Sequence, residues 1–237
     1  MLFKIENFIA SQTPLSRRKI LELLNQNAIT LNGQVVTSLN QEVNPKKDHV
    51  KISGESVIFQ FPFVYYMFYK PKGVICTTAD PQGRRDLTEF LRHIKQPVFP
   101  VGRLDRQTSG LLLLTNDGHF AHQILHPKFA LKKTYLVGLD HSISKQDLNR
   151  LLVGMILEDG PVQYTQVLAQ SPTKISLSIQ EGRNRIVRRT FEFLGYDVKS
   201  LKRTAIGFLS LQGLKEGDIK PLSKFQVSKF NSVSELD

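Results

Sequence analysis

The chain has 237 residues, 41% of them hydrophobic and 22% charged, so it can bury a core, and its length favours a small domain followed by a larger one. Lys and Arg outnumber Asp and Glu by 32 to 21, and the net charge of +11 favours a polyanionic partner. A single cysteine, Cys76, excludes an internal disulfide and is expected to be a packed thiol, and no apolar run approaches the roughly 18 residues of a membrane span. Because the N-terminus lacks the apolar core of a secretory signal, we expect a cytoplasmic protein.

A small α+β unit is predicted over residues 1–60. Ser16 can cap a helix whose apolar residues recur at helical spacing. These apolar residues are Ile20, Leu21, Leu23 and Leu24. Residues 28–36 follow as a pair of strands, because Asn32-Gly33 is a strong hairpin signal.

Three cations, Arg17, Arg18 and Lys19, occupy the first turn of that helix, where the helix dipole disfavours each by roughly a few tenths of a kcal/mol. Two interpretations stay open, a solvated polar face and a contact with an RNA backbone. The order Ser-Arg-Arg, helix, then "ITLNGQVV" resembles the alpha-L RNA-binding module of several ribosomal proteins and RNA-modifying enzymes. The opening "MLFKIENFIA" departs from that module, which often begins with Arg-Leu-Asp.

A second α+β domain is predicted over residues 61–231, followed by a polar tail over 232–237. Period-two patterns and apolar runs predict four strands. They are "VYYMFYK", ending before Pro71 and Gly73, "LLLLT" (111–115), "KKTYLVGL" (132–139) and "KISLSIQ" (174–180). Helices are predicted after the turn at 116–118, after a Ser144 cap, and before Gly195. Lys70-Pro71 is interpreted as part of a plain turn.

Asp105 lies in a turn directly before the "LLLLT" strand. A carboxylate at the edge of a core is costly unless a cation pairs with it, and the pairing keeps it ionised at neutral pH. Arg103 and Arg106 are its neighbours in sequence. The basic helix near residues 184–195 offers a further partner, because Arg188 borders its apolar stripe and can reach inward. That stripe consists of Val187, Phe191 and Leu194.

Four motifs follow one another along the chain: "FPVGRLDRQTSGLLLLTNDG", "LHP", "KKTYLV" and "EGRNRIVRR". From residue 65 to about 225 the chain resembles the RsuA-type bacterial pseudouridine synthases, which modify ribosomal RNA. The resemblance implies a mixed, largely antiparallel sheet with flanking helices and a central cleft. It also implies that Asp105 is catalytic, that Tyr135 stacks on the target uracil and that Arg188 pairs with Asp105, with Arg103 as a further active-site residue.

The reaction implied by this resemblance breaks the N1–C1′ bond of uridine, turns the uracil and joins C5 to the same sugar carbon. A carboxylate could attack C1′ or C6, or could remove the 2′ proton of the sugar. The base must leave its stack, and an aromatic platform offsets part of that cost.

Ribosomal RNA is the expected partner of a monomer that needs no metal and no cofactor. The residues expected to bind this RNA are Arg17, Arg18, Lys19, Arg106, Lys133, Arg183, Arg185 and Arg189. Ile186 departs from the family, which commonly has Gln or Glu there.

Simpler interpretations exist for each residue. Asp105 taken alone is more often a structural ion pair, and Tyr135 alone a core aromatic. His119, His122 and His126 recur at helical spacing but lack the ligand pattern of a metal site. The rival function is a non-catalytic ribosomal RNA-binding factor, which would have no need of Asp105. A metal-dependent nuclease would need clustered carboxylates, which the sequence lacks.

Overall fold

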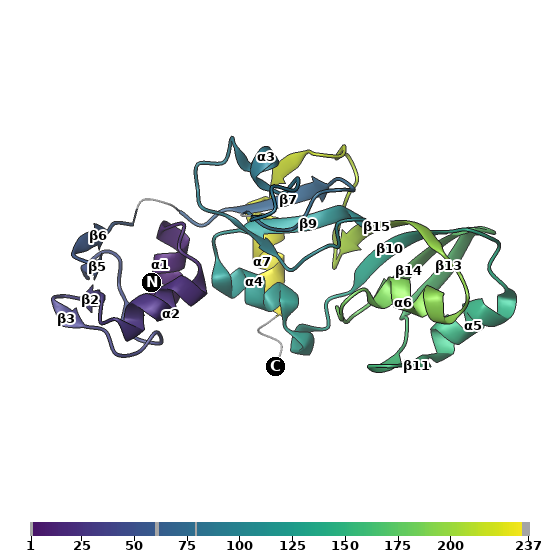
Figure 1. Cartoon of the computed structure of the whole chain (residues 1–237), viewed down its shortest axis with the longest axis horizontal. Helices are drawn as coiled ribbons and strands as arrows, with labels where there is room; N and C mark the ends of the chain where they lie inside the picture. Colours follow the sequence, from purple (N-terminus) through teal and green to yellow (C-terminus); the bar gives the residue numbers. More distant parts are fainter. Residues whose placement is uncertain (1, 60–61, 79, 234–237) are drawn as a thin grey trace.

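The computed structural model describes residues 2–59, 62–78 and 80–233. The molecule is elongated, with an N-terminal region of helices and short strands at one end and a large mixed sheet in the remainder (Figure 1). The predicted α+β class is confirmed, while the domain boundary at residue 60 stays a prediction. Within the described ranges, no helix has the length and apolar character needed to cross a membrane.

In the N-terminal region, two helices pack beside short strands. Its elements are β1 (Phe3–Lys4), α1 (Ile5–Gln12), α2 (Arg17–Asn25), β2 (Ile29–Leu31), β3 (Gln34–Val35), β4 (Glu42–Val43), β5 (Val50–Ile52) and β6 (Glu55–Val57). As predicted, the Ser16 hydroxyl caps α2 by accepting the N–H of Lys19 at 3.2 Å. Asn32 and Gly33 turn the β2–β3 hairpin with φ of 51° and 84°. Of the predicted apolar residues of α2, Ile20 is buried, whereas Leu21 is 46% exposed.

One nine-stranded sheet forms the rest of the molecule, in the order β13-β14-β10-β15-β9-β7-β17, with β8 and β16 beside β9 and β15. Its strands are β7 (Tyr65–Lys70), β8 (Phe99–Val101), β9 (Ser109–Thr115), β10 (Lys133–Leu139), β13 (Gln166–Ser171), β14 (Lys174–Ile179), β15 (Val198–Ile206), β16 (Leu209–Ser210) and β17 (Ile219–Pro221). Every pair is antiparallel except β9 with β15. The four predicted strands all lie in this sheet, and the mixed, largely antiparallel arrangement is confirmed.

Helices and a small hairpin complete this part of the molecule. They are α3 (Thr88–Leu91), α4 (Gly118–Leu125), the 3-10 helix η1 (Pro127–Phe129), α5 (Lys145–Val153), the hairpin strands β11 (Met155–Leu157) and β12 (Gly160–Val162), α6 (Ile186–Phe193) and α7 (Lys224–Val233). Asp117 caps α4 and Ser144 caps α5, while Gly195 follows α6 with φ of 88°. Helix α7 extends two residues into the predicted tail, and the remainder of that tail, 234–237, lies outside the described residues.

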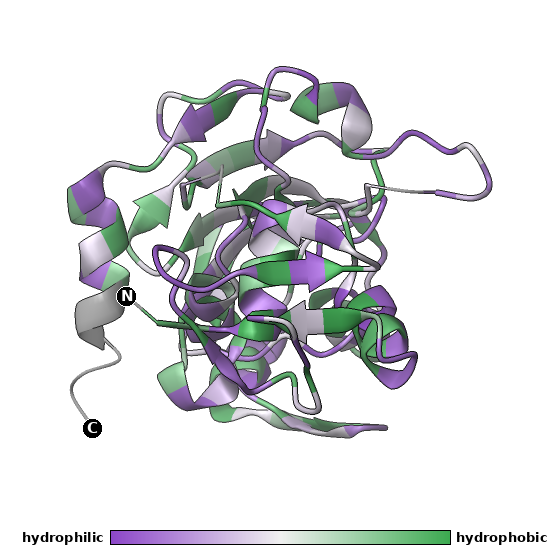
Figure 2. Ribbon diagram, turned by 90° about the vertical axis from the view of Figure 1, so that its left-hand side faces the viewer, coloured by the Kyte–Doolittle hydropathy of each residue, from purple (hydrophilic) through white to green (hydrophobic). Residues whose placement is uncertain are grey.

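The leucine run of β9 is buried on both faces of the sheet. Leu111 and Leu113 pack into the cluster that contains residues of α4 and α7, whereas Leu112 and Leu114 pack into a second cluster that includes residues of α3. Strand side chains alternate between faces, so a strand covered on both sides needs an apolar residue at every position. In Figure 2 the central strands are accordingly largely hydrophobic, and many of the peripheral loops are polar.

Gly110 allows β9 and β15 to lie unusually close. Its φ is +116°, and a Cβ there would lie 2.5 Å from the backbone nitrogen of Arg203 and closer still to its carbonyl oxygen.

We expect Gly110→Ala to lower the free energy of unfolding by about 3 kcal/mol or more, because backbone strain and overpacking each cost roughly 1–3 kcal/mol. Denaturant unfolding measures this loss. The control is Gly33→Ala, since Gly33 has φ of +84° and open space around its Cβ position. Equal losses in both variants would contradict an explanation by close contact.

Candidate active site

Asp105 lies in the loop of residues 102–108, between β8 and β9, and a cysteine holds this loop in place. The Cys76 thiol donates to the carbonyl oxygen of Leu104 and accepts the Leu104 N–H, both at 3.2 Å. Burial raises the pKa of Cys76, which keeps the thiol protonated and able to donate. Cys76 is therefore a packed thiol, as predicted, and it also fixes the residue before Asp105.

Further backbone hydrogen bonds hold the same loop. The N–H of Gly73 donates to the carbonyl oxygen of Arg106 at 2.7 Å, and Arg106 Nε donates to the carbonyl oxygen of Gly73 at 3.3 Å. Within the loop, the N–H of Thr108 donates to the carbonyl oxygen of Asp105 at 2.9 Å and closes a turn. The segment 73–76 thus supports Asp105 from one side.

Arg188 supports the loop from the other side. As predicted, it reaches inward from α6 and is buried, with 8% exposure. Its Nη2 donates to the carbonyl oxygen of Gln107 at 2.9 Å, and its Nη1 to that of Val198 at 3.1 Å. Among the described residues, no ion pair within 4.0 Å joins it to Asp105, and its two Nη atoms donate to carbonyl groups instead. Burial lowers the pKa of Arg188, and the charge of Asp105 opposes that shift.

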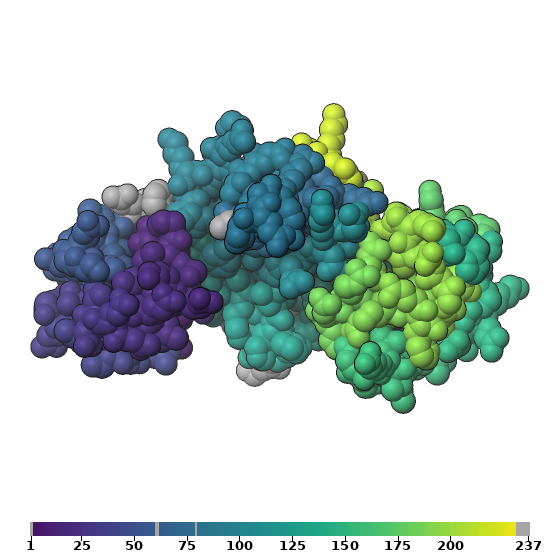
Figure 3. Space-filling view, in the orientation of Figure 1, coloured from purple at the N-terminus to yellow at the C-terminus, as the bar shows by residue number. Residues whose placement is uncertain are grey.

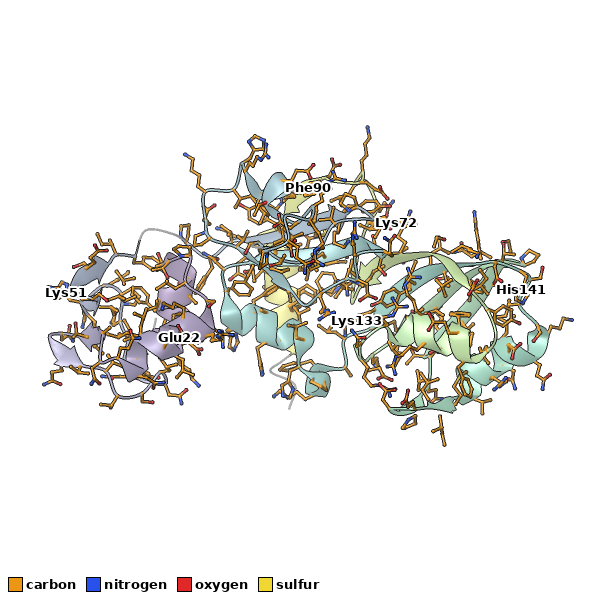
Figure 4. The ribbon with its side chains drawn as sticks, viewed as in Figure 1. Glu22, Lys51, Lys72, Phe90, Lys133 and His141 are labelled. Atoms are coloured by element: carbon orange, nitrogen blue, oxygen red, sulfur yellow. The ribbon has the colours of Figure 1, made fainter. Side chains whose placement is uncertain are left out.

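A cavity of about 360 Å³ opens beside the Asp105 loop. Six residues predicted from the sequence line it, namely Arg103, Asp105, Lys133, Tyr135, Arg183 and Arg185. Its volume lies within the range of sites for small ligands, roughly 300–1,000 Å³. A larger groove of about 1180 Å³ adjoins it and shares Leu125, Lys133 and Arg183 with it, and Asp105 lines the smaller space. In Figure 4, Lys133 lies between the centre of the molecule and the half that contains α6.

Tyr135 occupies the middle of β10, between Leu177 of β14 and Arg203 of β15. Its half-buried ring packs against two hydrophobic clusters, the one around β10 and α6 and the one that includes Leu112. Since the ring also lines the cavity with Asp105, it has the position required of a platform for a planar ligand.

The predicted RNA-binding residues lie in three places. Arg17, Arg18 and Lys19 lie on α2 in the N-terminal region and do not line the cavity. Arg183 and Arg189 both form ion pairs with Asp159 in the β11–β12 turn, at 2.9 and 2.6 Å, so they hold this hairpin against the start of α6. Arg185 lines the cavity, is exposed and pairs with Glu192 at 3.2 Å, and the exposed Arg106 follows Asp105 in the loop.

Sequence reasoning missed two buried cations near Asp105. Lys70 was assigned to a plain turn, but it ends β7 with no solvent exposure, and its Nζ donates to the carbonyl oxygens of Pro71 and Val74 at 2.9 and 2.7 Å. Burial lowers the pKa of Lys70 to about 8, although Asp105 opposes the shift. Arg203 is 5% exposed, and its Nε donates to the carbonyl oxygen of Leu111 at 2.7 Å. Neither residue stands in a sequence pattern that distinguishes it from a surface cation.

Three buried polar atoms around the Asp105 loop lack hydrogen-bond partners within the described part of the chain. They are Thr108 Oγ1, Arg188 Nε and Arg203 Nη2. A buried donor without a partner costs roughly 1–3 kcal/mol, so this region is less stable than a fully bonded core. Such costs concentrate at functional sites.

Ile186 and the three histidines near residue 122 lie outside the loop that carries Asp105. Ile186, which departs from the family pattern, is 5% exposed and packs in the cluster around α6, so its position favours an apolar side chain. His119 and His122 lie on the exposed side of α4, and His126, also exposed, is its C-cap residue. Across the ranges that the structure describes, no group of three or more His, Cys, Asp or Glu residues is arranged to hold a metal ion.

Comparisons with known proteins show the family of the chain. The family model described as RNA pseudouridylate synthase matches residues 64–193. The chain belongs to this family. It is 40% identical to "Ribosomal large subunit pseudouridine synthase B" of Bacillus subtilis, over 98% of this chain and 97% of that protein. It is 33% identical to "Ribosomal small subunit pseudouridine synthase A" of Pasteurella multocida, over 96% and 99%. A crystal structure of a pseudouridylate synthase superposes with a TM-score of 0.68 at 30% identity, over 95% of this chain and 98% of that chain.

As an RNA pseudouridine synthase, the protein is an isomerase, and its site suits that reaction. A carboxylate, an aromatic ring and several cations surround one cavity of nucleotide-binding size. The cations favour a bound phosphate backbone and an ionised carboxylate. The ring can offset the cost of removing a base from its stack.

Because the pKa of Lys70 is lowered, its burial should make the free energy of unfolding rise with pH above about 8. Its pKa of about 8 in the folded protein lies below the ordinary value of 10.5, so between these pH values the unfolded chain binds more protons. The free energy of unfolding of the wild type should therefore rise, relative to Lys70→Met, as the pH increases from 8 toward 10. Denaturant titrations at pH 7.5 and 9.5 measure the difference. Lys72→Met, which removes an exposed lysine, serves as the control and should follow the wild type. A Lys70→Met variant with the pH dependence of the wild type would contradict a lowered pKa.

Proposed function

We propose that this enzyme isomerises a specific uridine of large-subunit ribosomal RNA, with Asp105 as its catalytic residue. The observation that carries the proposal is the position of Asp105, which lies on a loop held from two sides at the wall of a cavity lined by Tyr135. The higher identity to a large-subunit enzyme, 40% against 33% to a small-subunit one, supports the choice of substrate. The net charge of +11 suits a polyanion.

In this proposal each residue has a distinct role. The carboxylate of Asp105 attacks C1′ or C6 of the flipped nucleotide, or removes its 2′ proton, and all three routes require the ionised form. Tyr135 stacks on the uracil after it leaves the RNA helix. Arg188 acts as a positioning residue, because it holds the Asp105 loop through the carbonyl oxygen of Gln107. Arg103 and Lys133 line the cavity and bind the RNA backbone.

The N-terminal region is proposed to be an alpha-L RNA-binding module over residues 1–60, with the synthase domain after it. Its α2 carries Arg17, Arg18 and Lys19, and the side chain of Arg18 is 91% exposed. Each of the three pairs with Glu6 or Glu22, yet such exposed pairs are worth at most about 1 kcal/mol, so a phosphate can replace them. The protein would act as a monomer in the cytoplasm, where ribosomal RNA is modified.

Pseudouridine mapping by carbodiimide modification and reverse transcription tests this proposal. In a strain that lacks the gene, one stop in large-subunit ribosomal RNA should disappear, and the wild-type gene should restore it. Asp105→Ala should fail to restore it at equal expression, because no other described carboxylate lines the cavity near that loop. Asp197→Ala, which removes an exposed carboxylate that does not line the cavity, should restore it fully.

Each result has a separate meaning. Restoration by Asp105→Ala would reject the catalytic role and favour a non-catalytic RNA-binding factor. A stop that disappears from small-subunit ribosomal RNA instead would reject the choice of substrate and leave the role of Asp105 intact.

A further inference from the structure

The exposed side of α4 carries a face of three imidazoles, called here the histidine face: His119, His122 and His126. His119 and His122 stand three residues apart on α4, and His126, the C-cap residue of this helix, follows His122 by four residues. The rings of His122 and His126 lie 4.7 Å apart, and both adjoin the ring of Phe129 in η1. These residues take no part in the cavity around Asp105.

The charged groups around this face are mainly cations. On His122 the neighbouring charges are His126, His119, Lys128 and Arg17, all positive or able to become so. Helix α7 packs on the buried side of α4, where its Phe230 contacts Phe120. Two acidic residues lie near the histidine face, and both already have hydrogen-bond or ion-pair partners. Glu6 pairs with Arg17 at 3.4 Å, and Asp117 caps α4 and accepts the Tyr65 hydroxyl at 2.8 Å.

The histidine face lies between the N-terminal region and the catalytic cavity. At the start of α4, a Cβ placed on Gly118 would lie 2.6 Å from Arg17 Nη2, so the guanidinium of α2 adjoins the helix. At its end, Leu125 is 47% exposed and lines the cavity that contains Asp105. Figure 1 shows α4 between α2 and the half of the molecule that contains α6. In Figure 3 the α4–η1 segment forms the lower middle of the surface, between the same two parts.

We propose that the histidine face binds the phosphate backbone of the RNA that runs from the N-terminal region to the target uridine, and that it binds more tightly when its imidazoles are protonated. This inference rests on the proposed function, since it assumes an RNA substrate in the cavity. It assigns a role to residues that the reaction at Asp105 does not use.

The geometry explains how an imidazole can serve a phosphate at this position. His126 Nδ1 accepts the N–H of Lys128 at 3.2 Å, so the proton of the neutral ring is on Nε2, which can donate outward. For His122, partial burial and the surrounding cations lower the pKa, so the free protein holds this ring mainly neutral at pH 7.5. A phosphate beside the rings favours the protonated form, and RNA binding then takes up protons.

The experiment measures RNA affinity against pH and salt. Binding of in vitro transcribed Bacillus subtilis 23S ribosomal RNA is followed in the Asp105→Ala background, so that no product forms. From pH 7.5 to pH 6.0 the Kd should fall about tenfold, as expected for two or three new surface charge contacts. The slope of log K against log salt should steepen by about 0.7–0.9 for each imidazole that becomes protonated on a phosphate.

A triple variant, His119→Asn, His122→Asn and His126→Asn, should lose most of this pH dependence, with a change in Kd below about threefold. Asn suits position 126 because its side-chain oxygen can accept the same Lys128 N–H. The control is His93→Asn with His141→Asn, two exposed histidines away from α4, and it should keep the pH dependence of the parent. In Figure 4, His141 lies at the far end of the molecule.

Three outcomes would overturn the inference. The triple variant could keep the pH dependence of the parent, the control could lose it, or the triple variant could bind free RNA normally and lose only its binding to ribosomal assembly intermediates, which would indicate a protein partner. Because these are binding measurements, they are independent of the mapping experiment. If mapping finds no modified site but the histidine face still binds RNA as described, the proposed catalysis fails and this inference stands.

Discussion

The loop that carries Asp105 has no regular secondary structure, so the position of its carboxylate depends on hydrogen bonds from other segments. Gly73 and Cys76 hold it on one side, and Arg188 holds it from α6 on the other. A typical bond of this kind contributes about 1 kcal/mol net, so several together can fix a short loop. Catalysis needs groups held within about 0.5 Å, and this explains why a buried arginine ends on a backbone carbonyl.

The same region concentrates positive charge around one carboxylate. Lys70, Arg188 and Arg203 are all at least nine-tenths buried, and Asp105 is the acid that acts on both Lys70 and Arg188. Burying cations in excess of anions lowers stability in the free protein, as the lowered pKa values of Lys70 and Arg188 indicate. A polyanion reverses this balance, because each phosphate near the cavity brings a counter-charge. The arrangement therefore suits an enzyme whose substrate is RNA.

Local signals made much of the fold predictable, and long-range packing explains what was missed. The caps at Ser16 and Ser144 and the Asn32-Gly33 turn depend on neighbouring residues alone, and each forms as predicted. The β11–β12 hairpin was missed because its position depends on ion pairs from Arg183 and Arg189 to Asp159. Burial of Lys70 was also missed, since two carbonyl groups that accept from its Nζ become partners only after the chain turns.

The predictions for the site also divide into features that a local pattern predicts and features that depend on long-range contacts. Periodicity identified Arg188 as the arginine that turns inward from α6, and this is confirmed. The hydrogen-bond partner of Arg188 was not predicted correctly, because helical spacing indicates the direction of a side chain and not the atom that it contacts. The chain supplies the carbonyl oxygen of Gln107, two residues after Asp105, in place of the carboxylate. Arg188 can thus hold Asp105 in position while leaving the carboxylate oxygens free of a direct ion pair.

The cavity itself follows from the way two parts of the sheet meet. Strands β9 and β15 are seven and nine residues long, yet they pair at only two positions, Lys202 with Ser109 and Arg203 with Gly110. Beyond these pairs β9 joins β7 and β8, whereas β15 joins β10 and β16. Leu201 of β15 belongs to the cluster around β10 and α6, whereas Ile206 and Leu209 belong to the cluster of Leu111 and Leu113. Leu201 and Ile206 of β15 line the cavity together with Val101, Thr108 and Asp105. The short parallel pairing thus joins the two halves of the sheet beside the cavity in which, in the proposed reaction, a flipped base meets the carboxylate.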